Sequence, residues 1–353
     1  MDNDKTIYSR VLFIGPHLKN RGGISSVLAS YKAHLPEFHH LATNSLKGTV
    51  PGLFNFARTL VLLPFVRLFT PYRILDIHGS SLKSWRRKSL IIRLGKLLGF
   101  KISFHCHSAI FKDFVEDKGV DNIKSVFEKC DCVFALSDTW KQYFDETFGL
   151  GKFFTLNNMS DTPASYQANI DKPNDDIVRF VFMAWFDQRK GIFDLLDVMA
   201  KNVDYFRGKA KIVLCGRYNE KMVQRFIAEH HLEDIAEFKG WVAGEEKDKV
   251  FRECDILLMP SYAEGLPVSI LESFTYAMPV ITTPVGAIPE VVKYGENGVL
   301  FSPGDQEALF RAMKFYCDNQ QEIKRQGQNS KELSKKFLPD AIIRRLTKVL
   351  ETL

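Results

Sequence analysis

The hydrophobic residues of the chain gather in short apolar runs that alternate with stretches of helical periodicity. Runs of four to eight apolar residues between polar or turn residues are typical of buried strands, whereas apolar residues spaced three or four apart indicate helices. Strands are predicted at residues 11–15, 73–78, 101–107, 132–136, 177–185, 211–215, 236–238, 255–259 and 280–283, and helices at 23–35, 84–98, 192–200 and 219–231. This alternation predicts an α/β fold with parallel, doubly wound sheets.

The alternation is interrupted once, by a polar stretch at residues 161–176 that contains two prolines and several Asp and Asn residues. Such a stretch is the best linker candidate in the chain. The length of 353 residues is enough for two domains of about 150 residues each. We therefore predict domains at residues 1–165 and 166–335, followed by a final amphipathic helix within residues 336–353.

Composition favours a cytoplasmic protein with ordinary cores. Hydrophobic residues make up 45% of the chain. The first residues include acids and lead directly into the first strand, so no signal peptide is expected. The six cysteines lie in or beside apolar runs without zinc-ligand spacing, which is typical of reduced, buried thiols.

Positive charge is concentrated in one region of the first half. Residues 47–101 contain eleven Lys and Arg but one acid, Asp76, whereas the whole chain has a net charge of only +6. Two segments of this region, 53–69 and 85–100, also carry many Leu, Ile, Val, Phe or Trp residues. Cations mixed with apolar side chains suit the surface of an anionic bilayer. The residues predicted to contact a membrane or an acceptor are Trp85, Arg86, Arg87, Lys88 and Arg93.

The region is not expected to span a membrane. The longest apolar stretch, residues 59–69, is about half of the roughly 20 residues that a spanning helix needs, and it contains Pro64 and Arg67. The segments could also be ordinary helices that cover a sheet and expose their cations to water. Nucleic acid is not an expected partner, because no RNA-binding signature or zinc finger accompanies the charge.

The most informative chemistry lies in the run Pro-Ser-Tyr-Ala-Glu-Gly-Leu-Pro-Val-Ser-Ile-Leu-Glu, residues 260–272, after an apolar strand. Gly265 permits a tight turn, and Pro267 suits the first turn of a helix that we expect to run to about residue 277. A helix start can hold a diphosphate through its unpaired amides and dipole. Glu264 before the turn and Glu272 inside the helix could accept hydrogen bonds from hydroxyls. This layout suits a nucleotide sugar.

At this point the chain resembles the retaining family-four glycosyltransferases of the GT-B fold. Their signature is two glutamates with seven residues between them, followed by a Pro-Val-rich strand and a Gly-containing turn, which residues 277–286 match. The resemblance implies two Rossmann-like domains facing each other across a cleft. The first would bind the acceptor and the second the nucleotide sugar, and the helix at 336–353 would pack back on the first.

The resemblance also assigns residues. Glu272 should hold the ribose hydroxyls, and Glu264 should meet hydroxyls of the transferred sugar. The residues implied to be catalytic are His107, Glu264 and Lys190. The other residues implied to bind the donor are Gly22, Gly23, Arg189, Gly216, Trp241, Val242, Gly265, Leu266 and Pro267. The implied activity is transfer of a sugar from a nucleotide diphosphate sugar, UDP favoured over GDP, to a saccharide or lipid-linked saccharide in cell-surface polysaccharide synthesis.

Histidines end two of the predicted strands. His105 and His107 should point to the same face of the sheet, where they could bind a metal or form a hydrogen-bonded structural pair. No third or fourth ligand stands at recognisable spacing, so no metal is expected. The resemblance places His107 beside the reacting sugar, with His78 as a weaker candidate. Without a metal cofactor, fixed cations and amides must neutralise the leaving diphosphate.

One position departs from the family pattern. The family has a Gly-Arg pair shortly before its Lys-Gly, where this chain has Ala184 and Trp185 before Lys190. Arg189 could supply the missing guanidinium.

Two alternative functions stay open. The protein could be a non-catalytic protein that binds a sugar nucleotide or a partner, or it could be a sugar-nucleotide epimerase. The absence of a GxGxxG motif after the first strand argues against a nicotinamide dehydrogenase. The expected location is the cytoplasm, peripheral to the inner face of the plasma membrane.

Overall fold

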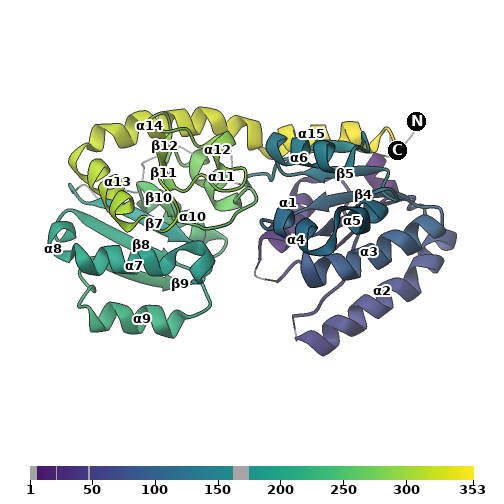
Figure 1. Ribbon diagram of the computed structural model, residues 1–353, viewed down its shortest axis with the longest axis horizontal. Coiled ribbons are helices and arrows are strands. Elements are labelled where there is room, and N and C mark those ends of the chain that lie inside the picture. Colours follow the sequence, from purple (N-terminus) through teal and green to yellow (C-terminus); the bar gives the residue numbers. More distant parts are fainter. Residues whose placement is uncertain (1–5, 21, 47, 162–174) are drawn as a thin grey trace. The chain divides into compact units, whose positions relative to one another are not determined.

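The computed structural model describes residues 6–20, 22–46, 48–161 and 175–353 (Figure 1). The chain forms two compact units. The first unit comprises residues 1–159 together with 339–353, and the second comprises residues 160–338. The expected boundary between residues 165 and 166 lies outside the described residues.

The first unit is built on a parallel six-stranded sheet with the strand order β2-β1-β3-β4-β5-β6. Its strands are β1 (Val11–Gly15), β2 (His40–Ala42), β3 (Ile74–Gly79), β4 (Lys101–Cys106), β5 (Cys132–Ala135) and β6 (Phe153–Thr155). All residues of β1 and β3 are buried, as expected for parallel strands covered on both faces. The sequence pattern did not predict the edge strands β2 and β6, which are three residues long and only partly buried.

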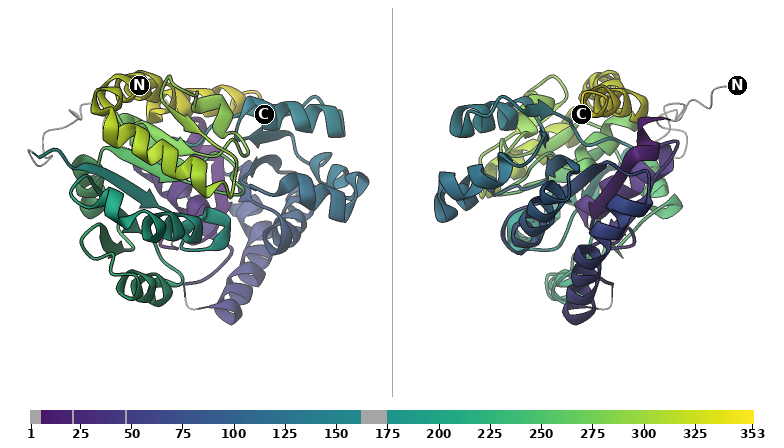
Figure 2. Two further views of the ribbon diagram at one scale, coloured as in Figure 1. Left: turned by 60° about the vertical axis from the view of Figure 1, so that its left-hand side comes forward. Right: turned by 90° about the vertical axis from the view of Figure 1, so that its right-hand side faces the viewer.

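Helices pack on both faces of this sheet (Figure 2). They are α1 (Gly23–His34), α2 (Thr49–Phe69), α3 (Leu82–Leu97), α4 (Phe111–Lys118), α5 (Val120–Phe127), α6 (Asp138–Phe148) and, from the end of the chain, α15 (Pro339–Leu350). A short 3₁₀ helix, η1 (Ile7–Arg10), precedes β1. Helix α15 buries Ile342, Leu346 and Leu350, which recur every four residues. The Tyr8 and Thr347 hydroxyls lie 2.7 Å apart and join the two ends of the chain.

Helix α3 corrects two of the expected membrane contacts. Trp85 is buried and makes edge-to-face contacts with four phenylalanines, Phe104, Phe111, Phe114 and Phe127. Lys88 is also buried, and its Nζ donates to Thr43 Oγ1 over 2.6 Å. Both residues lie on the helix face that packs on the sheet, so neither can meet a bilayer surface. Arg86 and Arg93 are exposed on the opposite face, and Arg87 is half-buried.

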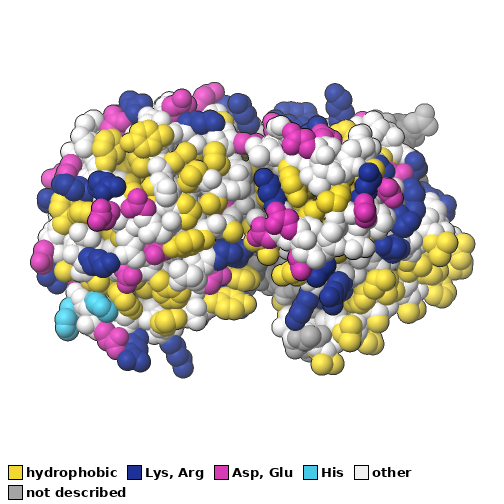
Figure 3. Space-filling view, in the orientation of Figure 1, with side chains coloured by type: hydrophobic (Ala, Val, Ile, Leu, Met, Phe, Trp, Pro, Cys, Tyr) yellow, Lys and Arg dark blue, Asp and Glu magenta, His cyan; other side chains and the backbone are white. Residues whose placement is uncertain are grey.

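Helix α2 is longer than the apolar stretch suggested. By length and composition alone, Val50–Phe69 could cross a membrane, a test that core helices of soluble proteins also pass. This corrects the expectation that no segment of the region is long enough. The helix packs against β2 and α3 and buries Phe56, Thr59 and Leu63. Hydrophobic side chains gather on its outer surface (Figure 3): Val50, Leu53, Phe54, Val61, Phe65, Leu68 and Phe69.

The second unit repeats the architecture, with a parallel sheet in the order β12-β11-β10-β7-β8-β9. Its strands are β7 (Val178–Met183), β8 (Ala210–Cys215), β9 (Ala236–Gly240), β10 (Ile256–Met259), β11 (Val280–Thr282) and β12 (Gly298–Leu300). Its helices are η2 (Gln188–Lys190), α7 (Ile192–Lys201), α8 (Val203–Phe206), α9 (Glu220–Glu229), α10 (Glu245–Glu253), α11 (Val268–Thr275), α12 (Ile288–Val291), α13 (Gln306–Asp318), α14 (Gln320–Ser334) and η3 (Lys335–Phe337). The two parallel sheets confirm the predicted α/β fold.

Candidate functional site

Except for Glu272, the expected donor residues of the second unit lie in the segments that directly follow the carboxyl ends of its strands, where open α/β sheets bind ligands. Lys190 follows β7, Gly216 follows β8, Trp241 and Val242 follow β9, and Glu264 follows β10. Strands β7 and β10 are neighbours in the sheet, so the loops after them meet.

Glu264 and Lys190 form an ion pair between these two loops. Lys190 Nζ donates to Glu264 Oε1 over 2.5 Å, and the Ser261 hydroxyl donates to the same oxygen over 2.8 Å. Glu264 is only 6% exposed. The Glu264 carboxylate is therefore shielded from solvent, and its charge is balanced by a cation from another loop. A ligand with hydroxyls and phosphates could place its hydroxyls against Glu264 and its phosphates against Lys190.

Two glycines hold the Glu264 loop and the Lys190 turn in place. Gly191 has φ +71°, and a Cβ there would lie 2.0 Å from the Pro260 carbonyl oxygen. Gly286 has φ +57°, and a Cβ there would lie 1.9 Å from the Glu264 carbonyl oxygen. The Ala287 amide donates to Gly265 O over 2.9 Å. Backbone packs directly on backbone at both points, which leaves these loops little freedom.

Glu272 lies in α11 and pairs with a lysine that sequence analysis missed. Lys247 Nζ, from α10, donates to Glu272 Oε1 over 2.5 Å. Helix α10 is tied to the end of α11 because Tyr276 donates to Asp248. Helix α11 begins at Val268 and ends at Thr275, two residues before the expected end, and Pro267 occupies its N-cap. Among the residues that the structure describes, no side chain caps the first turn, so its amides are available to a ligand.

The departure at Trp185 has a structural counterpart. The Trp185 ring stacks on Tyr218, with centroids 4.7 Å apart, and the Arg217 guanidinium lies 5.3 Å from the Tyr218 ring centre. Arg217 directly follows Gly216 and is a second cation that sequence analysis missed. Arg189 is exposed. Arg189 and Arg217 follow the neighbouring strands β7 and β8.

Other expected donor residues have local structural roles. A Cβ at Gly216 would lie 2.1 Å from the Ala184 carbonyl oxygen, so close packing explains this glycine. Val242 is buried and Trp241 is partly buried. Gly22 caps α1 with an extended backbone, and a Cβ at Gly23 would meet nothing within 4 Å. Packing within the described residues therefore does not explain Gly23.

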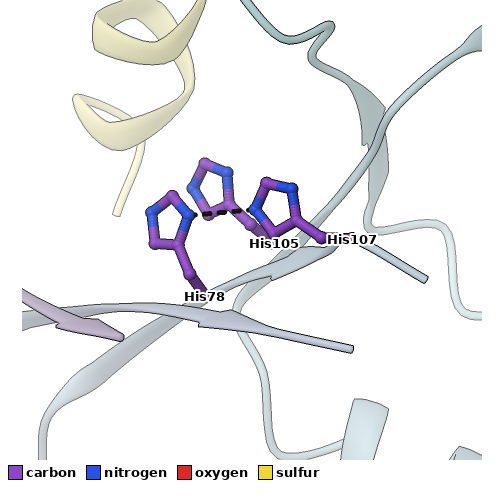
Figure 4. A group of neighbouring side chains, drawn as sticks. All are labelled: His78, His105 and His107. Atoms are coloured by element: carbon purple, nitrogen blue, oxygen red, sulfur yellow. Dashed lines mark hydrogen bonds between the residues drawn. The ribbon is translucent and has the colours of Figure 1, made fainter. Parts of the chain in front are cut away.

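The first unit contains a polar network at the carboxyl ends of β3 and β4. Asp76 lies beside Ser103, and His78 beside His105, in the register of these strands. The Asp76 carboxylate accepts from the Ser103 hydroxyl over 3.0 Å and lies 2.9 Å from His78 Nε2 and 3.0 Å from His105 Nε2. The two histidines, His105 first, hold the pKa of this buried carboxyl well below its usual range, against the effect of burial. His107 joins the network through His78 (Figure 4), with Nδ1 of His78 3.0 Å from Nε2 of His107.

The three histidines do not form a ready metal site. Their ring nitrogens lie within 4.8 Å of one another, so His78 is the third ligand that sequence analysis had not recognised. The rings are nearly parallel, however, at interplanar angles of 8° to 14°, and His78 stacks face to face on His105. Nitrogen lone pairs lie in the ring plane, so parallel stacked rings cannot direct them at one ion. Metal binding would require the rings to turn.

Comparisons with known proteins agree with this architecture. The family model of the glycosyl transferases group 1 matches residues 166–333. The uncharacterized glycosyltransferase MJ1178 of Methanocaldococcus jannaschii is 30% identical over 173 residues, which cover 49% of this chain and 48% of that protein. The putative colanic acid biosynthesis glycosyltransferase WcaL of Salmonella typhimurium is 28% identical over 142 residues, which cover 38% and 35%. The match thus spans at most about half the length of these relatives.

Solved structures share the fold over nearly the whole chain. Sucrose-phosphate synthase of Thermosynechococcus elongatus has a TM-score of 0.78 at 16% identity, covering 97% of this chain and 98% of that one. Anabaena HepE, solved in complex with UDP and glucose, has a TM-score of 0.72 at 15% identity, covering 98% and 100%. The shared architecture shows that the chain has the GT-B fold of these glycosyltransferases, and its residues 166–333 are similar to the group 1 glycosyltransferases.

Proposed function

We propose that the protein is a retaining glycosyltransferase that moves a sugar from a nucleotide diphosphate sugar to a hydroxyl of a saccharide or lipid-linked saccharide. The ion pair of Lys190 with the buried Glu264, beside the uncapped start of α11, carries this proposal. HepE binds UDP in its crystals, which supports a UDP-sugar over a GDP-sugar. Relatives named for colanic acid and amylovoran biosynthesis support a role in cell-surface polysaccharide assembly.

The proposed chemistry needs carboxylates that accept hydrogen bonds and cations that stay in place. Glu272 holds the ribose, so it is not the nucleophile of a double displacement, and the acceptor attacks on the face from which the diphosphate leaves. Lys190 and the arginines 189 and 217 offset the charge that grows on the leaving diphosphate. The amides of the first turn of α11 donate to the same group.

The experiment is a binding series followed by a transfer assay. Thermal unfolding is measured with UDP, GDP, TDP, CMP and NADH, and a ligand at 100 times its Kd adds about 2.7 kcal/mol to the unit that it binds. A shift with UDP supports a UDP-sugar donor, and a shift with GDP alone would redirect the search to GDP-sugars. Glu272→Gln and Lys190→Met should weaken the shift. The control Glu307→Gln, at a largely exposed position of α13, should not.

Variants separate the alternatives. Glu264→Gln should abolish transfer with radiolabelled sugar nucleotides while UDP still binds. If the wild type and Glu264→Gln bind UDP equally and neither transfers sugar to any acceptor, a non-catalytic protein is favoured. Interconversion of the donor without an acceptor would favour an epimerase.

We propose that no metal is needed, because protein cations face the diphosphate. Equal transfer rates with EDTA and with Mg²⁺ are expected, and loss of transfer in EDTA would contradict this.

We further propose that the first unit docks on the anionic inner surface of the plasma membrane and takes a lipid-linked acceptor there. Phe54, Phe65 and Leu68 are exposed along one face of α2, and Arg86 and Arg93 are exposed on the neighbouring α3.

Between α1, β2 and α2 lies a pocket of about 780 Å³. Its charged and titratable lining consists of His17, Lys19, Lys32, His40 and Arg58, with no acid among the described lining residues. This lining suits a phosphate group of the acceptor.

Vesicle sedimentation tests the docking. Binding to phosphatidylglycerol vesicles, and none to phosphatidylcholine vesicles, is expected, with release by salt. A Phe54→Ser/Leu68→Ser variant should lose binding and keep its response to UDP. Retention of the protein in membranes after alkaline extraction would instead show that α2 crosses the bilayer. Absence from anionic vesicles at low salt would remove the support for a lipid-linked acceptor.

A further inference from the structure

The chain of contacts from Asp76 to His107 determines which ring nitrogens carry protons. His78 Nε2 lies 2.9 Å from Asp76 Oδ1, although the two atoms do not meet in the geometry of a hydrogen bond. A bare Nε2 carries partial negative charge and would repel a carboxylate oxygen at this distance, so the carboxylate favours the tautomer with the proton on Nε2. Burial, followed by the charge of neighbouring His105, lowers the pKa of His78 to about 3. His78 is therefore neutral near pH 7, and its Nδ1 is a bare acceptor.

The next link follows from the first. His78 Nδ1 and His107 Nε2 lie 3.0 Å apart with their rings tilted by only 14°. Since His78 Nδ1 can only accept, His107 Nε2 must donate. A neutral His107 then has a bare lone pair on Nδ1, the nitrogen that points away from His78 in Figure 4. His107 is partly exposed, unlike His78 and His105, so it is the histidine of this network that a ligand can reach.

We propose that Asp76 and His78 are positioning residues that fix His107 as its Nε2–H tautomer and thereby make Nδ1 an obligatory hydrogen-bond acceptor. His107 then receives a hydrogen bond from a substrate hydroxyl and cannot donate one to the leaving oxygen. The tautomer follows from these contacts together with the neutral state of His78. The role toward a sugar hydroxyl rests on the proposed function.

The contacts that run from Asp76 through His78 to His107 form a relay, and the groups that surround this relay keep its proton positions fixed. Ser103 and His105 hold the second side of the Asp76 carboxylate, so the carboxylate cannot turn away from His78. The Tyr31 ring packs edge-on against His78, at 5.5 Å between centroids, and keeps water from it. The nearest buried cation, Lys88, donates to Thr43, and its charge further lowers the pKa of His78. An aspartate that orients a histidine in this way fixes its tautomer in other enzymes.

The first experiment reads the tautomer without any assay of activity. In the full chain labelled with ¹⁵N-histidine, long-range proton–nitrogen correlation spectra distinguish protonated from bare ring nitrogens, and a His107→Gln variant assigns the His107 signals. The wild type should show a protonated Nε2 and a bare Nδ1 near neutral pH. His78→Phe should release His107 into a mixture of tautomers. Nδ1–H in the wild type, or an unchanged His107 in His78→Phe, would overturn the proposal.

A matched control comes from the same network. His105→Phe removes a comparable contact with Asp76 but keeps the hydrogen bond between His78 and His107, and Ser103 still holds the carboxylate, so the protonation of the His107 ring nitrogens should stay as in the wild type. Thermal unfolding of each variant shows whether the fold is retained. Titration with Zn²⁺ provides the rival outcome: shifts of all three histidines at one equivalent of metal would replace the relay with a metal site.

The second experiment measures the consequence for transfer. His78→Phe should lower kcat roughly tenfold and leave KM for the nucleotide sugar unchanged. This loss is smaller than the about 10²- to 10⁴-fold expected when a positioned acid–base group is removed, because His107 itself remains. His105→Phe should change kcat less. Equal losses in the two variants would indicate a merely structural network. If the tautomer is as inferred but no variant or wild type transfers sugar, the proposed function fails and the relay stands.

Discussion

Gly286 gives the sharpest test of how the Glu264 loop is held. A Cβ at this position would lie 1.9 Å from the Glu264 carbonyl oxygen, and the backbone has φ +57°. In Gly286→Ala the contact must open to at least 3.0 Å, so the loop must move by about 1.1 Å. A misplacement of about 1 Å near a reacting group can cost roughly 10²-fold in rate.

Gly295 offers a matched control in the same unit. It has a similar φ of +73°, but a Cβ there would meet nothing within 4 Å. Gly295→Ala and Gly286→Ala both incur the cost of a left-handed backbone, about 1–2 kcal/mol. Only Gly286→Ala also displaces the Glu264 loop. The difference between the two variants therefore isolates the contact with Glu264.

The assay compares unfolding temperature, UDP affinity and transfer rate for the two variants. Gly295→Ala should lower the Tm by a few degrees, at about 2–4 °C per kcal/mol, and leave transfer unchanged. Gly286→Ala should lose a further part of its stability and about 10²-fold in transfer rate. If the two variants had the same stability and the same rate, the backbone contact between Gly286 and Glu264 would not be what positions the Glu264 carboxylate.

Three further predictions address other parts of the molecule. Trp85→Ala should reduce the free energy of unfolding by about 3–5 kcal/mol, because the ring fills the core; unchanged stability with weaker vesicle binding would restore its membrane role. Lys247→Met should destabilise the protein by about 1–3 kcal/mol by leaving Glu272 without its partner, and saturating UDP should recover part of the loss; identical urea curves with and without UDP would count against this. Burial lowers the pKa of His40 to about 4 and of His78 to about 3, against about 6.5 unfolded. The unfolded chain therefore binds these protons first, and the free energy of unfolding should fall as the pH drops from about 6.5 toward 4; a constant urea midpoint over this range would contradict it.

Much of the fold follows from local pattern. Buried parallel strands produce apolar runs such as β1 and β10, and these were located within about two residues. The edge strands β2 and β6 escaped because a three-residue strand that is covered on one side has no periodicity of its own. The pairing of Glu264 with Lys190 could be expected because both follow neighbouring strands. Lys247 could not be, since its contact with Glu272 depends on how α10 packs on α11.

The errors on α3 have a physical cause. Helical periodicity tells which residues share a face but not which face meets the sheet, and Lys88 lies on the buried face with Trp85. The Asp76 network did leave a signal. Asp76 and His78 are two residues apart, and so are Ser103 and His105, which puts all four on one face of adjacent strands. Polar residues at alternate positions of otherwise apolar strands predict a buried network.

The return of α15 to the first unit affects the order in which the protein can be made. About 180 residues separate Met159 from Pro339, and all of them belong to the second unit. At about 5–20 residues per second, the ribosome needs roughly 10 to 40 s to synthesise them. During this time the first unit lacks the helix that covers its apolar surface through Ile342, Leu346 and Leu350. The unit that is translated first is therefore the last to be completed, and chains shortened at the C-terminus would leave that surface uncovered permanently.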